Sequence, residues 1–270
     1  MPSSHALLAT TVSGGEGPVG QQEYFPTNQT NMTGSWTCPA DVFSVSVVCI
    51  GGGGDSPNGS GGGLGYKNNI PVVPGQTYAY QASCVGDTHN GAPPVDSWFK
   101  NASGTIVCKG EAGTRGQGNA GGSYVGDGGG NGGATGMSSG GYAGSGGGGG
   151  YSGNGGEGGS DGGGSRGACG GGTGNKGQGA SGGGGGNGYP GSGGGGGGGN
   201  GSSTSPKGGD GSGGSSPYGS QSGGYSGGGC ADILQAKWWS GGEGPGNGTV
   251  RIIWPGTSRQ FPSTRTADES

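Results

Sequence analysis

The alternation of hydrophobic and polar residues predicts β-strands in the first part of the chain. Across residues 42–50, every second position is held by Phe43, Val45, Val47 and Cys49. This period of two places the four side chains on one face, and the run is rich in β-branched residues, which is typical of a half-buried strand. We therefore expect residues 42–50 to form one strand of a small β-sheet.

Further segments repeat this pattern and are separated by turn signals. Residues 71–76 combine a short extended piece with a proline–glycine turn, and residues 101–104 are the turn of a predicted hairpin. Residues 231–239 are the one candidate helix, and helix and irregular structure stay equally open there. The remaining predicted strands cover residues 77–82, 97–100, 105–109 and 249–254.

Glycine divides the chain into regions of different composition. Of 270 residues, 86 are glycine and only 25% are hydrophobic, so an ordinary apolar core cannot account for the whole chain. We expect a mostly β and irregular fold, in which a small antiparallel β-sandwich is interrupted by a bundle of polyglycine II helices. The expected parts are an N-terminal arm or attachment segment (1–30), the β-structure (31–109 and 230–270) and the glycine-rich insertion (110–229).

The glycine-rich insertion has two interpretations. A flexible glycine–serine linker would behave as a random coil. In a bundle of polyglycine II helices, neighbouring segments would instead pair their backbone N–H and C=O groups, because glycine has no side chain to keep them apart. A linker needs no tyrosines and would be far longer than ordinary loops, which favours the packed form. The tyrosines of this region are Tyr124, Tyr142, Tyr151, Tyr189, Tyr218 and Tyr225.

Charge and hydropathy exclude several functions. The net charge is −4, the isoelectric point is about 5.0, and the arginines are scattered, so we expect no nucleic-acid partner. The chain has no stretch of about 18 apolar residues, so we expect no membrane insertion. The first residues lack the basic region of a secretory signal peptide. We expect most cysteines to be free thiols. The six cysteines are Cys38, Cys49, Cys84, Cys108, Cys169 and Cys230.

Three segments resemble structural proteins of bacteriophages. Residues 36–54 join a tryptophan, a Pro-Ala turn, an alternating valine strand and a glycine run, and residues 63–78 continue with a second strand-like segment. Together they resemble the opening of glycine-rich domains in bacteriophage tail fibres. Residues 248–264 resemble a C-terminal signature of structural proteins from marine cyanobacterial phages. The resemblance covers residues 35–265.

The resemblance implies a virion protein at the distal end of a tail fibre, assembled in the host cytoplasm with other virion and tail-fibre proteins. In adhesins of the polyglycine II type, the helices form a rigid sandwich whose variable loops contact the host surface. The implied receptor is a surface glycan or an outer-membrane protein. A single tip copy and a homotrimer are both consistent with the resemblance. The cysteine count departs from the family, whose tail-fibre members usually have few.

Aromatic residues are the candidate receptor contacts. Tyrosine offers a large, fairly rigid amphipathic surface at little entropic cost. The alternative role for these rings is packing across the glycine-rich region. The tryptophan pair could stack on a sugar ring, or cover the end of a small β-core that has few other large residues. The candidates are Tyr142, Tyr151, Tyr189, Tyr218, Tyr225, Trp238 and Trp239.

No catalytic, metal or cofactor site is expected. His5 and His89 are the only histidines, and both lie in polar segments where a solvated side chain is the simpler interpretation. Residues 179–183 match Gly-x-Ser-x-Gly, but that motif needs a strand–turn–helix context and arises by chance among so many glycines. We therefore expect no enzyme. The leading hypothesis is a host-recognition protein; the alternatives are a non-adhesive virion decoration or fibre spacer, or a cellular glycine-rich structural protein.

Overall fold

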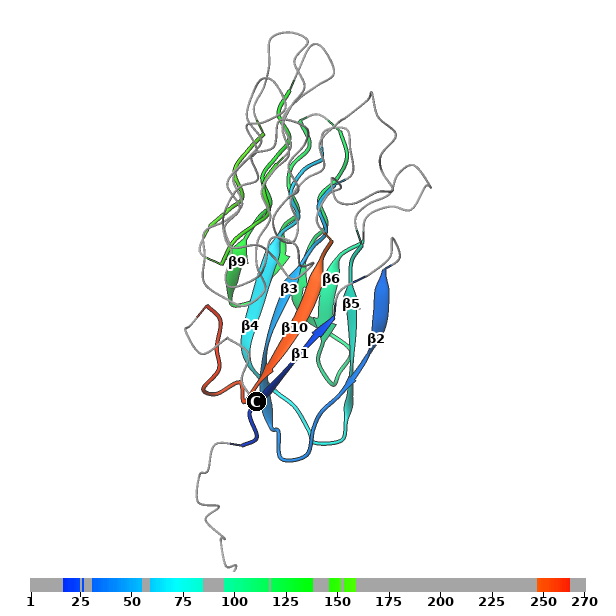
Figure 1. The fold of residues 1–270 in the computed structure, drawn as a ribbon, viewed down its shortest axis with the longest axis vertical. Helices are drawn as coiled ribbons and strands as arrows, with labels where there is room; N and C mark the ends of the chain where they lie inside the picture. The colour runs from blue at the N-terminus through cyan, green and yellow to red at the C-terminus, as the bar shows by residue number, and fades with distance from the viewer. Residues whose placement is uncertain are drawn as a thin grey trace, which may run out of the picture.

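The computed structural model shows two antiparallel β-sheets and, among the residues it describes, no helix. In Figure 1 the sheets occupy the lower part of an elongated molecule, with their strands running along its long axis. The structure describes residues 17–24, 26, 31–54, 59–84, 95–116, 118–137, 146–151, 153–158 and 247–262.

Each sheet has five strands, and every strand pairs with its neighbours in the antiparallel sense. The first sheet has the order β1-β10-β3-β4-β9, and the second has the order β2-β5-β6-β7-β8. The strands of the first sheet are β1 (Gly20–Tyr24), β10 (Thr249–Trp254), β3 (Ser44–Ile50), β4 (Leu64–Pro71) and β9 (Gly128–Gly130). Those of the second are β2 (Met32–Thr37), β5 (Thr77–Ala82), β6 (Ser97–Lys100), β7 (Ile106–Gly110) and β8 (Tyr124–Val125).

The main core lies between the two sheets and confirms the predicted alternation. Val45, Val47 and Cys49 of β3 point inward, and Tyr78 and Phe99 of the second sheet are buried in the same cluster. Complete burial of side chains of this size contributes about 1.5–3 kcal/mol each to folding. Burial of the apolar side chains at alternate positions is thus the force that brings the two sheets together.

A second apolar cluster covers the outer face of the first sheet, which corrects the prediction of a half-buried strand at 42–50. Val48, Ile50 and Ile253 point away from the main core, yet none has exposed surface. They share this outer cluster with Tyr151 and Phe261. The non-alternating part of β3, Val48-Cys49-Ile50, is therefore apolar because both faces of the strand are buried.

The predicted strand boundaries hold for β5, β6 and β10, and the predicted hairpin joins β6 to β7. Its turn is closed by the Asn101 side chain, whose Oδ1 accepts hydrogen bonds from the N–H groups of Ser103 and Thr105. Gly104 adopts a φ of 79°, a conformation that favours glycine. Phe43 was expected on the buried face, but it precedes β3 and is 66% exposed.

Two of the predicted boundaries differ from those of the structure. Residues 20–24 fall inside the expected N-terminal arm but form β1, which pairs with β10 in full register. Strands β8 and β9 fall inside the expected insertion but extend the two sheets. In each case pairing with a neighbouring strand overrides a local sequence that is polar or rich in glycine.

Candidate functional site: a glycine lattice above the sandwich

Seven segments, most of them rich in glycine, lie beyond one end of the sheets, and several of them continue directly from strands. Residues 51–54 follow β3, residues 59–63 lead into β4, and residues 111–114 follow β7. Figure 1 shows these segments rising in line with the strands from which they emerge. We call the seven segments the glycine lattice: residues 51–54, 59–63, 111–114, 118–123, 131–137, 146–150 and 153–158.

Segment 59–63 is the centre of the lattice, because its backbone bonds to five other segments. Its donated bonds are Ser60 N to Thr114 O at 2.9 Å, Gly61 N to Gly133 O at 3.0 Å and Gly63 N to Glu111 O at 2.8 Å. Among its accepted bonds are those from Gly51 N to Gly63 O, from Gly122 N to Gly61 O and from Gly149 N to Gly62 O, each at 2.9 Å. A β-strand bonds to two neighbours at most, so this segment is surrounded in a way that a sheet does not allow.

The same bonding continues outward from the centre. Gly133 N donates to Gly147 O at 2.7 Å, and Gly147 N donates in turn to Gly156 O at 2.9 Å. Gly155 N donates to Asn131 O at 2.8 Å, which links the outer segment back to an inner one. Buried backbone groups must be paired to avoid the cost of lost hydrogen bonds with water. Here they are paired between segments that belong to neither a β-sheet nor an α-helix.

Consecutive residues of the central segment approach three different neighbours. A Cβ atom added at Gly61, Gly62 or Gly63 would lie closer than 3.0 Å to a backbone carbonyl oxygen. These oxygens belong to Gly147, Gly51 and Ser123, in that order. The directions therefore change with every residue, unlike the two opposite faces of a strand. Only glycine allows the segments to approach this closely.

Glu111 fastens the lattice to the sandwich where β7 ends. Its carboxylate accepts a 2.5 Å hydrogen bond from Lys109 Nζ and a 3.1 Å bond from the N–H of Ser123. Its backbone accepts the Gly63 N–H bond of the central segment. The Lys109 ammonium and the Ser123 hydroxyl lower the pKa of Glu111 to about 2. One residue, Glu111, thus links three neighbouring segments, through its carboxylate and through its backbone carbonyl.

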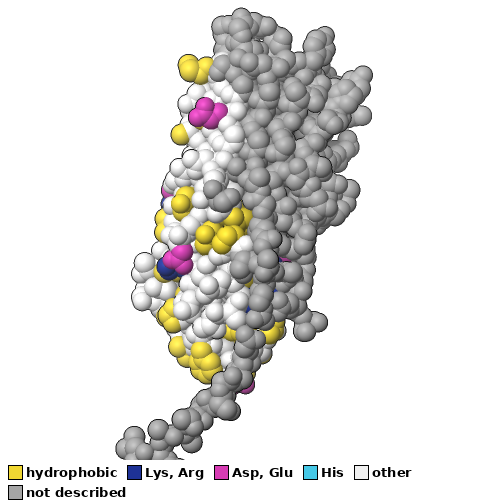
Figure 2. Space-filling view, turned by 90° about the vertical axis from the view of Figure 1, so that its left-hand side faces the viewer, with side chains coloured by type: hydrophobic (Ala, Val, Ile, Leu, Met, Phe, Trp, Pro, Cys, Tyr) yellow, Lys and Arg dark blue, Asp and Glu magenta, His cyan; other side chains and the backbone are white. Residues whose placement is uncertain are grey.

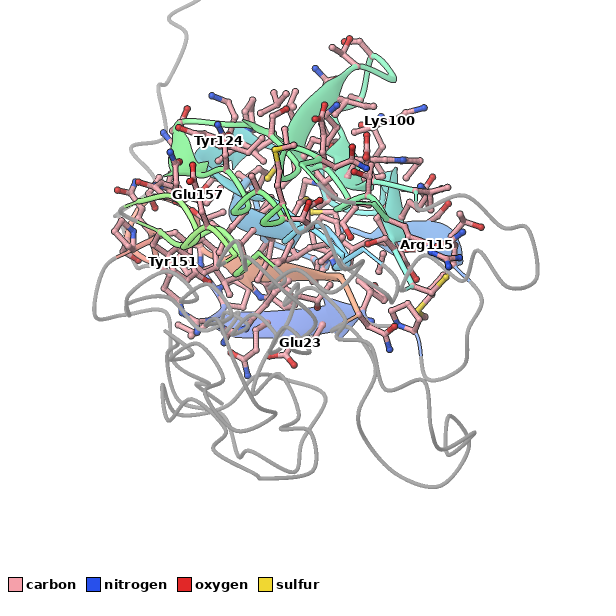
Figure 3. All side chains as sticks on the ribbon, turned by 90° about the horizontal axis from the view of Figure 1, so that it is seen from above. Glu23, Lys100, Arg115, Tyr124, Tyr151 and Glu157 are labelled. Carbon is pink, nitrogen blue, oxygen red and sulfur yellow. The ribbon has the colours of Figure 1, made fainter. Side chains whose placement is uncertain are left out.

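Tyr151 is the one candidate receptor contact that lies among the described residues. Its side chain is 3% exposed, and its ring stacks on Phe261 with the ring centroids 5.9 Å apart. Tyr66 lies beside both rings. Tyr151 therefore packs where the lattice meets the outer face of the first sheet (labelled in Figure 3). In this structure its side chain does not present a contact surface. The other candidates lie outside the described residues: Tyr142, Tyr189, Tyr218, Tyr225, Trp238 and Trp239.

The sequence analysis missed the residues that receive Tyr151. The Asn68 amide accepts a 2.9 Å bond from Phe261 N–H and donates a 2.7 Å bond to Phe261 O. This reciprocal pair holds the segment after β10 against β4, and so fixes the Phe261 ring over the sheet. An isolated large apolar residue in the polar C-terminal tail was the one signal of this contact.

The described part of the face seen in Figure 2 shows little that would suit a charged ligand. In Figure 2 the described part of the visible face consists mostly of backbone and uncharged polar atoms, with small separate hydrophobic patches and few charged side chains. Within the described ranges, no group of three or more His, Cys, Asp and Glu residues could hold a metal ion. His5 and His89 lie outside these ranges.

The four cysteines of the described residues are all buried, and three of them, Cys38, Cys49 and Cys108, are free thiols; the fourth is Cys84. Burial raises the pKa of the Cys49 thiol, and a hydrogen bond with Cys108 raises it further. These two cysteines therefore act as small apolar residues of the main core. Cys169 and Cys230 lie outside the described residues.

The described part of the chain contains no helix that is long and apolar enough to cross a membrane. Comparisons with models of protein families, with curated proteins and with solved structures found no match.

Proposed function

We propose that this chain is a phage virion structural protein that acts as an adhesin at the tip of a tail fibre. In this proposal the glycine lattice is a bundle of polyglycine II helices, and it serves as a rigid mount for loops that bind the host receptor. The observation that carries the proposal is the central segment 59–63, whose backbone bonds to five surrounding segments.

The geometry of that segment supports the polyglycine II assignment. Such helices have three residues per turn and no internal hydrogen bonds, so their N–H and C=O groups point outward in three directions. Gly61, Gly62 and Gly63 approach three different neighbours, as a three-residue turn requires. Bonding between extended segments, and not within them, fits the same helix type.

A mount of this kind suits receptor binding because its interior needs no particular side chains. The loops that connect the glycine segments can then change without disturbing a packed apolar core. A scaffold positioned by rigid elements with variable loops is the general arrangement of binding proteins. The proposed receptor is a glycan or an outer-membrane protein, bound by loop aromatics such as Tyr189 and Tyr218.

One observation favours the non-adhesive alternative, a decoration or fibre spacer protein. Tyr151 was a candidate contact, and it is buried against Phe261. If the other candidate aromatics are packed in the same way, the lattice would be a structural rod and not a binding tip. The two functions therefore differ in the exposure of the tyrosines and in the place of the protein on the virion.

Immunogold labelling of virions that carry this chain tests the proposal. Antibodies against the purified protein should label fibre tips, and the purified protein should compete with the phage for adsorption to host cells. Label on capsids without competition would favour the decoration protein. A Tyr189→Ala, Tyr218→Ala variant should lose the competition, whereas Tyr151→Phe, which keeps the packed ring, should retain it. Equal competition by both variants would contradict binding through the loop tyrosines.

A further inference from the structure

Strand β2 differs from the other three strands at the sheet edges. β8 and β9 have two and three residues, and β1 contains Glu23 and lies between Pro18 and Pro26. Short length, charge and nearby proline are the usual means by which proteins prevent edge-to-edge pairing. β2 has six residues, no charge and no proline. Pro39 follows β2 as closely as Pro26 follows β1, so β2 stands apart from β8 and β9 by its length and from β1 by its lack of charge.

The outer backbone groups of β2 can be assigned from the ladder. β2 pairs with β5, from Met32 opposite Ala82 to Thr37 opposite Thr77. Just beyond this ladder, Cys38 N donates to Gln76 O at 2.9 Å, so the backbone groups of Cys38 face β5. Backbone groups alternate in direction along an antiparallel strand. Those of the odd-numbered residues therefore face away from β5: Thr33, Ser35 and Thr37.

These odd-numbered residues are also accessible. The side chains of Thr33, Ser35 and Thr37 are exposed, and so is Met32 at 37%. Figure 1 places β2 at the margin of the sandwich, with no described segment beyond it. Among the described residues, β5 is the one strand that pairs with β2. The edge is thus an interaction surface whose chemistry calls for another extended strand.

We propose that β2 pairs antiparallel with β2 of a second copy of this chain, about a two-fold axis at Gly34. In this register Thr33 of each copy exchanges backbone hydrogen bonds with Ser35 of the other. Cross-strand pairs of hydroxyl side chains are favourable. Met32 lies opposite Trp36 of the other copy, but the Trp36 side chain is buried in the core of its own copy, so the pairing rests on the backbone bonds of Thr33 and Ser35. Because β2 has no charge, the two edges meet without like-charge repulsion.

The direction of the lattice is consistent with this pairing. The glycine lattice continues along the strand axes beyond one end of the sheets. Antiparallel pairing turns the second copy around, so the two lattices project from opposite ends and do not collide. A two-fold interface uses the same surface on both copies, and β2 meets that condition by itself. This inference does not depend on the adhesin proposal.

Analytical ultracentrifugation of the full chain, from about 1 µM to about 100 µM, tests the pairing. We expect a dimer at the upper concentrations. Ser35→Pro removes one outward N–H without touching the β5 ladder, and Ser35→Lys places like charges close to the axis. Each should raise the dimer dissociation constant on the order of tenfold or more. Thr77→Lys is the matched control, because it adds the same charge to the same face one strand further in.

The outcomes separate the possibilities. A dimer that Ser35→Lys weakens and Thr77→Lys leaves intact supports the proposal, with circular dichroism and melting temperature used to show that both variants are folded. A wild-type monomer at every concentration overturns self-pairing and leaves the edge to a strand of another protein. A dimer or trimer equally stable in wild type and Ser35→Lys also overturns it. If Ser35→Pro does not fold, the comparison of Ser35→Lys with Thr77→Lys still tests the proposal.

Discussion

The β-sandwich is held together by its side chains, whereas the glycine lattice is held together by its backbone. In the sandwich, side chains such as Val47 and Phe99 have no exposed surface, and the stabilising force is the removal of apolar area from water. In the lattice, segment 59–63 has glycine at four of its five positions and bonds to five neighbours through its backbone. The sandwich needs side chains of the right size, whereas the lattice needs positions with none.

This difference predicts opposite sensitivities to substitution. Removing atoms should harm the sandwich, because the cavity left behind cannot close fully. Adding atoms should harm the lattice, because a Cβ atom at a central glycine meets a backbone carbonyl that cannot move alone. The predictions that follow use this contrast, beginning with the largest effect.

Phe99→Ala should destabilise the protein most. Phe99 has no exposed surface and lies beside Trp36 and Tyr78 in the main core, so its removal should cost about 3–5 kcal/mol. Denaturant unfolding of the two proteins gives the difference in free energy. Phe43→Ala is the control, since Phe43 is 66% exposed and its removal should change stability by less than about 0.5 kcal/mol. Equal losses for the two variants would contradict the assigned core.

Gly62→Ala should cause the next largest loss of stability. The added methyl group would lie closer than 3.0 Å to backbone oxygens of residues 51 and 52, at a cost of about 1–3 kcal/mol. The matched control is Gly153→Ala, because a Cβ atom there would have no atom within 4 Å. Thermal melting of both variants is the measurement. If Gly153→Ala proved as harmful as Gly62→Ala, the close packing of the central segment would be refuted.

Glu111→Gln should have a smaller effect that depends on pH. The pKa of Glu111 is about 2 in the folded protein, below its ordinary value of 4.5. Its ionised form therefore contributes stability that is complete above pH 4.5 and is lost as the pH falls towards 2. Since the carboxylate is partly solvated, we expect less than about 1 kcal/mol. Unfolding of both proteins across this pH range should show the difference shrinking with acidity; a constant difference would mean that the Glu111 charge contributes nothing.

Alkylation of the native protein should leave the core thiols unmodified. Cys49 and Cys108 have no exposed surface, and burial raises the pKa of the Cys49 thiol, so the reactive thiolate is scarce. Iodoacetamide treatment followed by peptide mass spectrometry should show both cysteines modified in urea but not in buffer. Rapid native modification of either would place it outside the core.

Prediction from sequence succeeded where side chains carry a pattern. The strands β5, β6 and β10 follow from alternating or β-branched residues and from turn residues such as Gly104. β1 was missed because Gly-Gln-Gln-Glu-Tyr has no apolar alternation, and its pairing with β10 is a tertiary effect. Phe43 was placed on the wrong side of a strand boundary, since alternation alone does not say where pairing begins.

Packing between glycine segments was expected within residues 110–229, whereas the central segment of the glycine lattice, residues 59–63, lies in the part expected to be β-structure. Composition and the tyrosine spacing favoured packing between segments, but glycines carry no pattern that says which segment lies beside which. The central place of residues 59–63 comes from their position between β3 and β4, two strands that pair in the sandwich. The packing of Tyr151 on Phe261 joins residues far apart in sequence; Phe261, a large apolar residue in a polar segment, indicated a buried contact but not its partner.

Hydrogen–deuterium exchange tests the central claim most directly, because it reads the backbone amides that hold the lattice together. The N–H groups of Gly61, Gly63, Gly122, Gly133 and Gly147 all donate to other segments. We predict that peptides covering them exchange slowly, with protection approaching that of β3 in the sandwich core. Complete exchange of these peptides at the earliest time point, while β3 remains protected, would contradict the account and show that the glycine segments are solvated in the isolated protein.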